Sequence, residues 1–153
     1  MYFTELSAGE VQPLRTAVLR PHFEPGELAE FDRDDDPDTH HYGLVDDSKT
    51  PVAVVTYTAE PAPHDIGEPA TRLRGMAVAE ERRREGLGRR LLDSSLSRLA
   101  VQQPDLKIVW ANVRTSARDF YESHGFRPEG EVFEVPEIGP HIVMWRQMPR
   151  AIA

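Results

Sequence analysis

The chain has 153 residues, a formal net charge of −8, a hydrophobic content of 39% and no cysteine. Its length predicts one domain, residues 1–153, built around a single core, and the missing cysteines exclude disulfides, thiolate metal sites and a cysteine nucleophile. The negative charge argues against nucleic-acid binding, and no apolar run reaches the roughly 18 residues that a membrane span needs.

The first half of the chain predicts a small β-sheet and one helix. Apolar residues at helical spacing before Pro21 predict a helix that this proline stops. Two runs of β-branched and apolar residues flank Asp46-Asp47-Ser48-Lys49, which predicts a β-hairpin. The predicted elements are a strand over residues 3–6, a helix over 14–20, a loop over 21–39, and hairpin strands over 41–45 and 52–58.

The second half alternates strands and helices after a polar, proline-rich connection over residues 61–69. Strands before, between and after helices predict an α/β fold in which helices flank a mixed central β-sheet. The predicted elements are a strand over residues 73–78, a helix from 91 to about 100, a strand over 106–113, a helix over 115–125, and two final strands, one beginning at 126 and one containing 142–145.

A basic turn with two glycines separates the strand that ends at Val78 from the next helix. It reads Arg83-Arg84-Glu85-Gly86-Leu87-Gly88-Arg89. Free N–H groups and the helix dipole favour an anion at a helix start, glycines let the backbone approach a phosphate, and arginines add bidentate contacts. The turn lacks the Gly-Lys-Ser/Thr triplet of a P-loop and the third glycine of a dinucleotide fingerprint. The pattern therefore indicates another kind of phosphate site, or simply a basic helix start with two flexible glycines.

A second informative segment follows the strand over residues 106–113. It begins at Thr115-Ser116, where either hydroxyl can cap a helix, and it ends at Gly125, which favours the left-handed conformation that terminates a helix. Between these ends, the apolar and aromatic residues fall on one side of the helix. They are Ala117, Phe120, Tyr121 and His124.

Both segments resemble motifs of the GNAT acyltransferase superfamily. Arg83-x-x-Gly86-x-Gly88 is similar to the pyrophosphate-binding motif, and the segment from Ala117 through Phe120-Tyr121 to Gly125-Phe126 is similar to a second GNAT pattern. Two motifs in the family's order are more specific than either one. The resemblance covers about residues 72–148, and the outer segments 14–21 and 139–144 are similar to a group of small bacterial members. It implies a GNAT fold whose central strands splay apart.

The resemblance also implies how acetyl-CoA binds. The basic turn would hold the pyrophosphate, and the pantetheine arm would lie between the splayed strands and bond to backbone groups of one of them, like an added strand. An N–H of Met76 or Ala77 would stabilise the oxyanion of the reaction. Arg114 stands where the family often has Asn, a departure at one pantetheine contact. The cofactor-binding residues expected from the resemblance are Met76, Ala77, Val78, Arg83, Arg84, Gly86, Leu87, Gly88, Arg89, Asn112 and Tyr121.

The catalytic acid and base are not equally clear. Tyr121 matches the family tyrosine that protonates the leaving thiolate. The predicted central strand offers Arg72 and Arg74 rather than a carboxylate, so the base is sought elsewhere. His40, His41, Glu134 and His141 are the candidates, with Glu134 and His141 preferred, and deprotonation through ordered water is the alternative.

The function implied is an acetyl-CoA-dependent N-acetyltransferase that acts on the primary amine of a small molecule by direct attack in a ternary complex. The alternatives are a non-catalytic acyl-CoA sensor, a protein N-terminal or lysine acetyltransferase and, more weakly, a phosphate-binding regulatory module without CoA. We expect no metal, no nucleic acid and no membrane partner, and leave a homodimer open. The N-terminus lacks the regions of a signal peptide, so a cytoplasmic location is expected.

An acidic stretch over residues 24–38 ends in Asp34-Asp35-Asp36-Pro37-Asp38. Such a charge run is usually a solvated loop. The functional alternative is a negative rim that steers a cationic amine toward the site.

Overall fold

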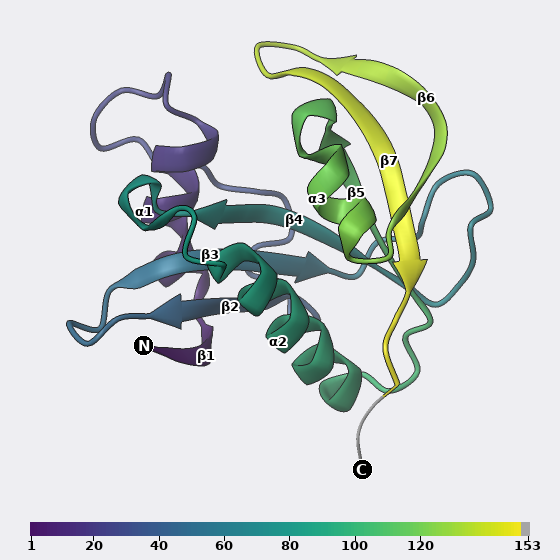
Figure 1. The fold of residues 1–153 in the computed structure, drawn as a ribbon, viewed down its shortest axis with the longest axis horizontal. Coiled ribbons are helices and arrows are strands. Elements are labelled where there is room, and N and C mark those ends of the chain that lie inside the picture. Colours follow the sequence, from purple (N-terminus) through teal and green to yellow (C-terminus); the bar gives the residue numbers. More distant parts are fainter. Residues whose placement is uncertain (151–153) are drawn as a thin grey trace.

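The computed structural model describes residues 1–150, and Figure 1 shows its elements. The strands are β1 (Tyr2–Leu6), β2 (His40–Val45), β3 (Pro51–Thr58), β4 (Ala70–Val78), β5 (Ile108–Arg114), β6 (Arg127–Val135) and β7 (Gly139–Gln147). The helices are α1 (Ala8–Leu19), α2 (Leu87–Gln102) and α3 (Arg118–Ser123), with short 3-10 helices η1 (Glu80–Arg82) and η2 (Thr115–Ala117).

The strands form one seven-stranded sheet in the order β1-β2-β3-β4-β5-β7-β6. β4 and β5 pair in parallel, and all other neighbouring strands of the described sheet are antiparallel. The β6–β7 hairpin curls around α3 (Figure 1). This arrangement confirms the predicted α/β fold with a mixed central sheet between helices.

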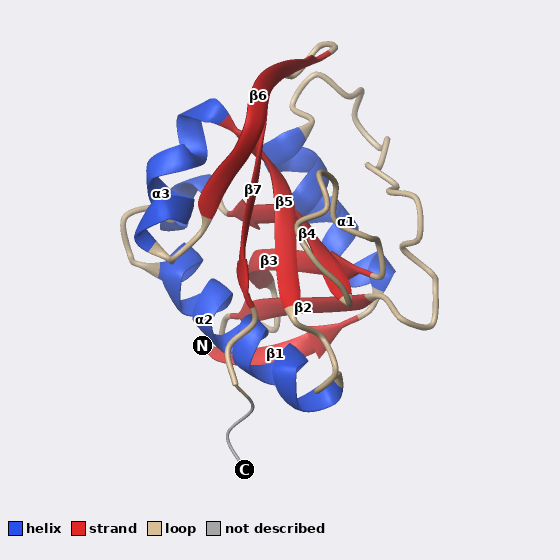
Figure 2. Cartoon of the chain, turned by 90° about the vertical axis from the view of Figure 1, so that its right-hand side faces the viewer, coloured by secondary structure: helices blue, strands red, loops and turns tan. Residues whose placement is uncertain are grey.

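Each face of the sheet has its own apolar cluster, because neighbouring residues of a strand point to opposite sides. Val55 packs with the leucines of α2 in the larger cluster, whereas Val54 packs with Val11 of α1 in the smaller one. The buried leucines of α2 recur at helical spacing and make one continuous stripe; they are Leu87, Leu91, Leu92, Leu96 and Leu99. Helix α1 accordingly lies on the opposite side of the sheet from α3 (Figure 2).

The central strands β4 and β5 splay apart, as the GNAT resemblance implied. They pair only from Ala70, opposite Ile108, to Arg72, opposite Trp110. Beyond this point β5 remains paired with β7, and β4 remains paired with β3. The facing backbone edges of β4 and β5 therefore have no strand partner over the rest of their described length.

A β-bulge in β4 accompanies this divergence. Arg74 lies opposite Thr56 and Ala77 lies opposite Val54, so two residues of β4 face one residue of β3. Gly75 occupies the bulge with a φ of +65°, and a Cβ there would come within 2.8 Å of the Arg15 side chain. A bulge bends its strand and increases the local twist. This turns the end of β4 away from β5.

Three helices differ from the predicted limits. The predicted start of α1 at residue 14 is wrong, because Ser7 and Glu10 form a capping box that begins the helix at Ala8, and Pro13 is tolerated inside it. Helix α2 begins at Leu87, so the basic turn includes its first residues. The predicted helix over 115–125 is shorter, because a 3-10 helix precedes α3.

Candidate active site

The splay between β4 and β5 contains a cavity of about 320 Å³. Its walls come from both sides of the sheet, because α3 contributes to one end and the end of α1 with the following loop contributes to the other. The lining residues are Leu19, Arg20, Phe31, Arg72, Leu73, Arg74, Gly75, Met76, Ala111, Asn112, Val113, Arg114, Ala117, Tyr121, Val135, Ile138 and His141. A cavity where a sheet opens, lined by apolar and a few polar groups, is the expected form of a ligand site.

The basic turn has the geometry of an anion site. Gly86 is the N-cap of α2, with a φ of +75°, and no side chain of the described residues bonds to the free N–H groups of this helix start. A Cβ at Gly86 would meet no atom within 4 Å, so glycine is needed there for its backbone angle and not for space. Arg83, Arg84 and Arg89 are exposed around the turn.

Gly88 connects this turn with the splay. A Cβ at Gly88 would lie 3.5 Å from Phe120 of α3 and 3.7 Å from Val78 at the end of β4. The start of α2 therefore lies directly beside the open end of the splay. The structure brings the two sequence motifs together, and their role in cofactor binding stays a prediction.

Tyr121 is buried at the edge of the cavity, and its hydroxyl donates to the Met76 sulfur at 3.6 Å. Phe120 and Phe126 pack edge-on against its ring, each with a centroid separation of 5.2 Å. Gly125, with a φ of +86°, ends the helix as predicted. Burial raises the pKa of Tyr121, so its hydroxyl stays protonated at neutral pH. A buried, protonated hydroxyl at the wall of the cavity has what a general acid needs, a proton that it can donate.

The residues predicted to hold the pantetheine arm lie where the strands separate. Met76, Ala77 and Val78 follow the bulge, on the length of β4 that lacks a partner on its β5 side in the described sheet. Asn112 is half-buried on β5 and lines the cavity. Arg114 also lines it, and its Nη2 donates to the Leu19 carbonyl at 3.1 Å.

Among the candidate bases, only His141 lines the cavity. It is buried on β7, and its Nδ1 lies 2.8 Å from the Gly139 carbonyl oxygen. Because a carbonyl only accepts, Nδ1 must carry the proton, which leaves Nε2 of the neutral ring free to accept one. This tautomer suits a general base.

The other candidates lie elsewhere. Glu134 is exposed on β6 and does not line the cavity. His40 bonds to Glu5 at 2.8 Å, and His41 lies in a buried network between the Thr56 hydroxyl and the Asp34 carbonyl. The structure therefore places these three residues outside the cavity lining.

A group of arginines at the far end of the cavity was not predicted as part of the site. Arg72 and Arg74 alternate with the buried Leu73 along β4, and this alternation in the sequence could have shown that they share the face of α1. Arg20 and Phe31 reach the cavity from the end of α1 and the following loop. No local pattern marks these two residues.

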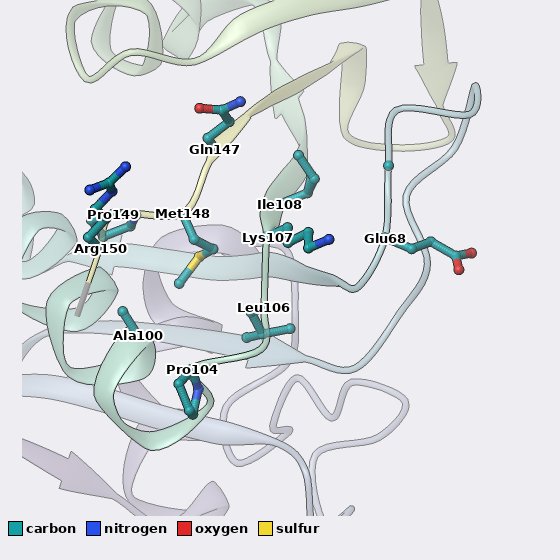
Figure 3. A pocket seen from close by; sticks show the side chains of 11 residues that line it. Glu68, Ala100, Pro104, Leu106, Lys107, Ile108, Gln147, Met148, Pro149 and Arg150 are labelled. Carbon is teal, nitrogen blue, oxygen red and sulfur yellow. The ribbon is translucent and has the colours of Figure 1, made fainter.

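A second cavity of about 480 Å³ lies near the start of β5 (Figure 3). It is bordered by Ala100 of α2, by Leu106 and Lys107 before β5, and by Met148 after β7. Its lining contains none of the predicted site residues. Its greater volume therefore does not make it the better candidate for the chemistry.

The comparisons with known proteins identify the family of this chain. A family model described as the acetyltransferase (GNAT) family matches residues 10–126, so the chain belongs to this family. YitI of Bacillus subtilis (strain 168), an uncharacterised N-acetyltransferase, is 29% identical over 143 residues, which cover 94% of this chain and 93% of YitI. The chain is therefore an acyltransferase enzyme of the N-acetyltransferase type, and the family to which it belongs uses acetyl-CoA.

Solved structures show the same fold. ElaA of Escherichia coli has a TM-score of 0.73 at 23% identity, covering 95% of this chain and 99% of ElaA. An aminoglycoside 6'-N-acetyltransferase in complex with coenzyme A has a TM-score of 0.72 at 14% identity, covering 100% of both chains.

Two further findings concern residues 1–150. Within this range, no three His, Cys, Asp or Glu side chains are grouped in a way that would hold a metal ion. None of the described helices combines the length and the apolar character needed to cross a membrane.

Proposed function

We propose that this protein, acting as a single domain over residues 1–153, transfers the acetyl group of acetyl-CoA to the primary amine of a small molecule in a ternary complex. The observation that carries the proposal is the position of Tyr121. Its protonated hydroxyl lies at the splay, where it donates to the side-chain sulfur of Met76, and the basic turn before α2 lies beside the open end of that splay. The aminoglycoside acetyltransferase that shares this fold was solved with coenzyme A.

In the proposed complex, the free N–H groups of Leu87, Gly88 and Arg89 bind the pyrophosphate, with Arg83 and Arg84 beside them. The unpaired edge of β4 bonds the pantetheine arm through Met76 and Val78. This places the thioester between β4 and β5. Asn112 lies on the β5 side of the same cavity, where its amide can bond to the arm.

The residues of the cavity then divide the chemistry. His141 Nε2 accepts the proton of the attacking amine, either directly or through water. The N–H of Met76 or Ala77 stabilises the negative charge that develops on the carbonyl oxygen. Tyr121 donates its proton to the sulfur as the C–S bond breaks and the C=O bond re-forms, and the proton held by His141 returns to Tyr121 through solvent. The products are an N-acetylated amine and free CoA.

The first test is binding. Thermal stability is measured with CoA, acetyl-CoA and ATP, and we expect CoA and acetyl-CoA to raise the melting temperature while ATP does not. A response to ATP alone would favour a phosphate-binding module instead. Release of free thiol is then measured over a library of small amines. Tight acetyl-CoA binding with no acceptor-dependent thiol release would favour a sensor, and release only with peptides or proteins would favour a protein acetyltransferase.

A further inference from the structure

The end of the cavity that is lined by the end of α1 and the following loop carries a strong excess of positive charge. Four arginines line it, namely Arg20, Arg72, Arg74 and Arg114, and no Asp or Glu is among the lining residues of the described chain. Like charges in a partly buried space repel one another, and the repulsion is stronger there than in water. The charge of such a cluster is therefore expected to be neutralised, either by nearby carboxylates or by a bound ligand.

One carboxylate accounts for only part of this charge. Glu60 lies 3.4 Å from Arg72 and 4.0 Å from Arg74. Burial alone would raise the pKa of Glu60, but its bond to Thr58 and the two arginines outweigh burial and lower that pKa, so it is fully ionised. The Nε–H groups of Arg72 and Arg74 are nevertheless buried without a hydrogen-bond partner in the described residues.

Arg20 and Arg114 have no carboxylate partner at all within residues 1–150. Both donate to the same acceptor, the Leu19 carbonyl oxygen at the end of α1, at 2.9 and 3.1 Å. The negative end of the helix dipole favours cations there. One carbonyl oxygen does not neutralise two guanidinium groups.

Aromatic rings supply further contacts of the cluster, and these add no negative charge. Arg74 and Arg15 each lie over the Phe31 ring, at 4.3 and 3.9 Å from its centroid. Burial and the charge of Arg72 lower the pKa of Arg74 to about 10, although Glu60 and Asp34 act in the opposite direction.

Of the acidic stretch over residues 24–38, only Asp34 offsets part of this charge, through its interaction with Arg74. Asp34 turns inward and forms a bidentate, buried ion pair with Arg15, and Asp36 lies 3.7 Å from Arg33 on the surface. Of this stretch, Phe31 alone lines the cavity among the described residues. The structure therefore does not place the acidic rim of the sequence hypothesis at the cavity wall.

We propose that the acceptor of this enzyme is a small amine that also carries a carboxylate, an amino acid in the broad sense, and that Arg20 and Arg114 bind this carboxylate. The inference rests on the proposed acetyl transfer. Tyr121 and the two arginines line one cavity of about 320 Å³, so a short molecule spans from the arginines to the splay. Arginine binds carboxylates in bidentate geometry, and the cluster opposes the binding of polycationic amines.

The test compares short amino acids with their own carboxamides as acceptors. The carboxamide keeps the amine and removes only the negative charge, and its less basic amine is deprotonated more readily. A preference for the carboxylate therefore cannot arise from easier deprotonation. We expect kcat/KM to favour the carboxylate at least about tenfold, and spermidine to be a poor acceptor. Equal rates, or a preference for the carboxamide or for spermidine, would overturn the inference.

Variants assign the effect to the two arginines. Arg114→Gln and Arg20→Gln remove the positive charge and keep a polar side chain, and each is expected to reduce the preference for the carboxylate by about tenfold. Arg98→Gln, the same change on an exposed surface of α2, is the matched control and leaves the preference intact. A purely structural role of the arginines at the end of α1 would lower stability while leaving the preference unchanged, and this result would overturn the assignment.

Binding distinguishes failure of this inference from failure of the proposed transfer. Calorimetry on the CoA-bound protein compares the same amino acids with their carboxamides, with no turnover needed. Selective binding of the carboxylate without thiol release would support the carboxylate site at Arg20 and Arg114 and overturn the transfer. Turnover of amines without selectivity for the carboxylate would support the proposed transfer and overturn the inference. Binding of neither compound would overturn the inference.

Discussion

Replacement of Tyr121 by phenylalanine separates catalysis from folding in this protein. The change removes one hydroxyl, whose hydrogen bond is to a thioether sulfur at 3.6 Å. A thioether is a weak acceptor, so the free energy of unfolding should change by less than about 1 kcal/mol. The packing of the ring against Phe120 and Phe126 is retained, and acetyl-CoA affinity should stay the same.

The effect on rate should be much larger. General acid catalysis contributes a factor of about 10²–10⁴, which corresponds to about 2.7–5.4 kcal/mol of transition-state stabilisation. Because burial raises the pKa of Tyr121, the hydroxyl stays protonated well past neutrality. The loss in kcat should therefore be uniform from about pH 6 to about pH 9, below the ordinary tyrosine pKa of about 10.

The assay is steady-state thiol release with saturating acceptor, together with urea unfolding and calorimetry of acetyl-CoA binding. Unchanged kcat across this pH range in the Tyr121→Phe enzyme would refute the reasoning. A structure of the acetyl-CoA complex in which the Tyr121 hydroxyl is more than about 4 Å from the thioester sulfur would do so as well.

Three further predictions concern other parts of the site. Gly88→Glu places a like charge at the anion turn and should abolish acetyl-CoA binding in calorimetry, whereas Gly88→Ala, whose Cβ makes ordinary contacts at 3.5 Å or more, should remain folded; unchanged affinity in a folded Gly88→Glu protein would refute the site. His141→Gln should lower kcat/KM by about 10²–10⁴-fold; an unchanged kcat/KM would favour deprotonation through water. Asp34→Asn leaves Arg15 buried without its partner and should destabilise the fold by about 3–5 kcal/mol at neutral pH in urea unfolding. Burial raises the pKa of Asp34, but its bonds to Arg15 and Phe31 outweigh burial and lower that pKa. The stabilisation by Asp34 is therefore present above the unfolded pKa of about 3.9 and is lost as pH falls below it. A stability difference between Asp34→Asn and wild type that persists undiminished at acid pH would contradict this.

The sequence by itself determined the features that depend on near neighbours. The turn around Gly86, the end of α3 at Gly125 and the hairpin at residues 46–49 each follow from residues within one turn or loop, because capping and left-handed backbone angles are local effects. Both family motifs consist of such local features. This is why the fold class and the two halves of the predicted cofactor site could be read without a structure.

Local rules failed where two of them disagreed. Pro13 argues against a helix through residues 8–19, whereas the capping box of Ser7 and Glu10 argues for one. The structure retains the helix, because α1 buries Val11 and its neighbours against the sheet and this packing outweighs the cost of the proline. Helix propensity by itself does not include this packing energy.

Only the tertiary structure decided how the cavity is built and charged. The splay depends on the bulge at Gly75, which is defined by the register of β4 against β3. The arginine cluster joins residues from the end of α1, from β4 and from β5, which lie far apart in the sequence. The same holds for Asp34, which the sequence presented as one charge in an acidic run and the fold buried against Arg15. Charges interact through space, so their effect on a ligand depends on which strands and loops become neighbours in the fold. No local pattern in the sequence specifies which elements become neighbours.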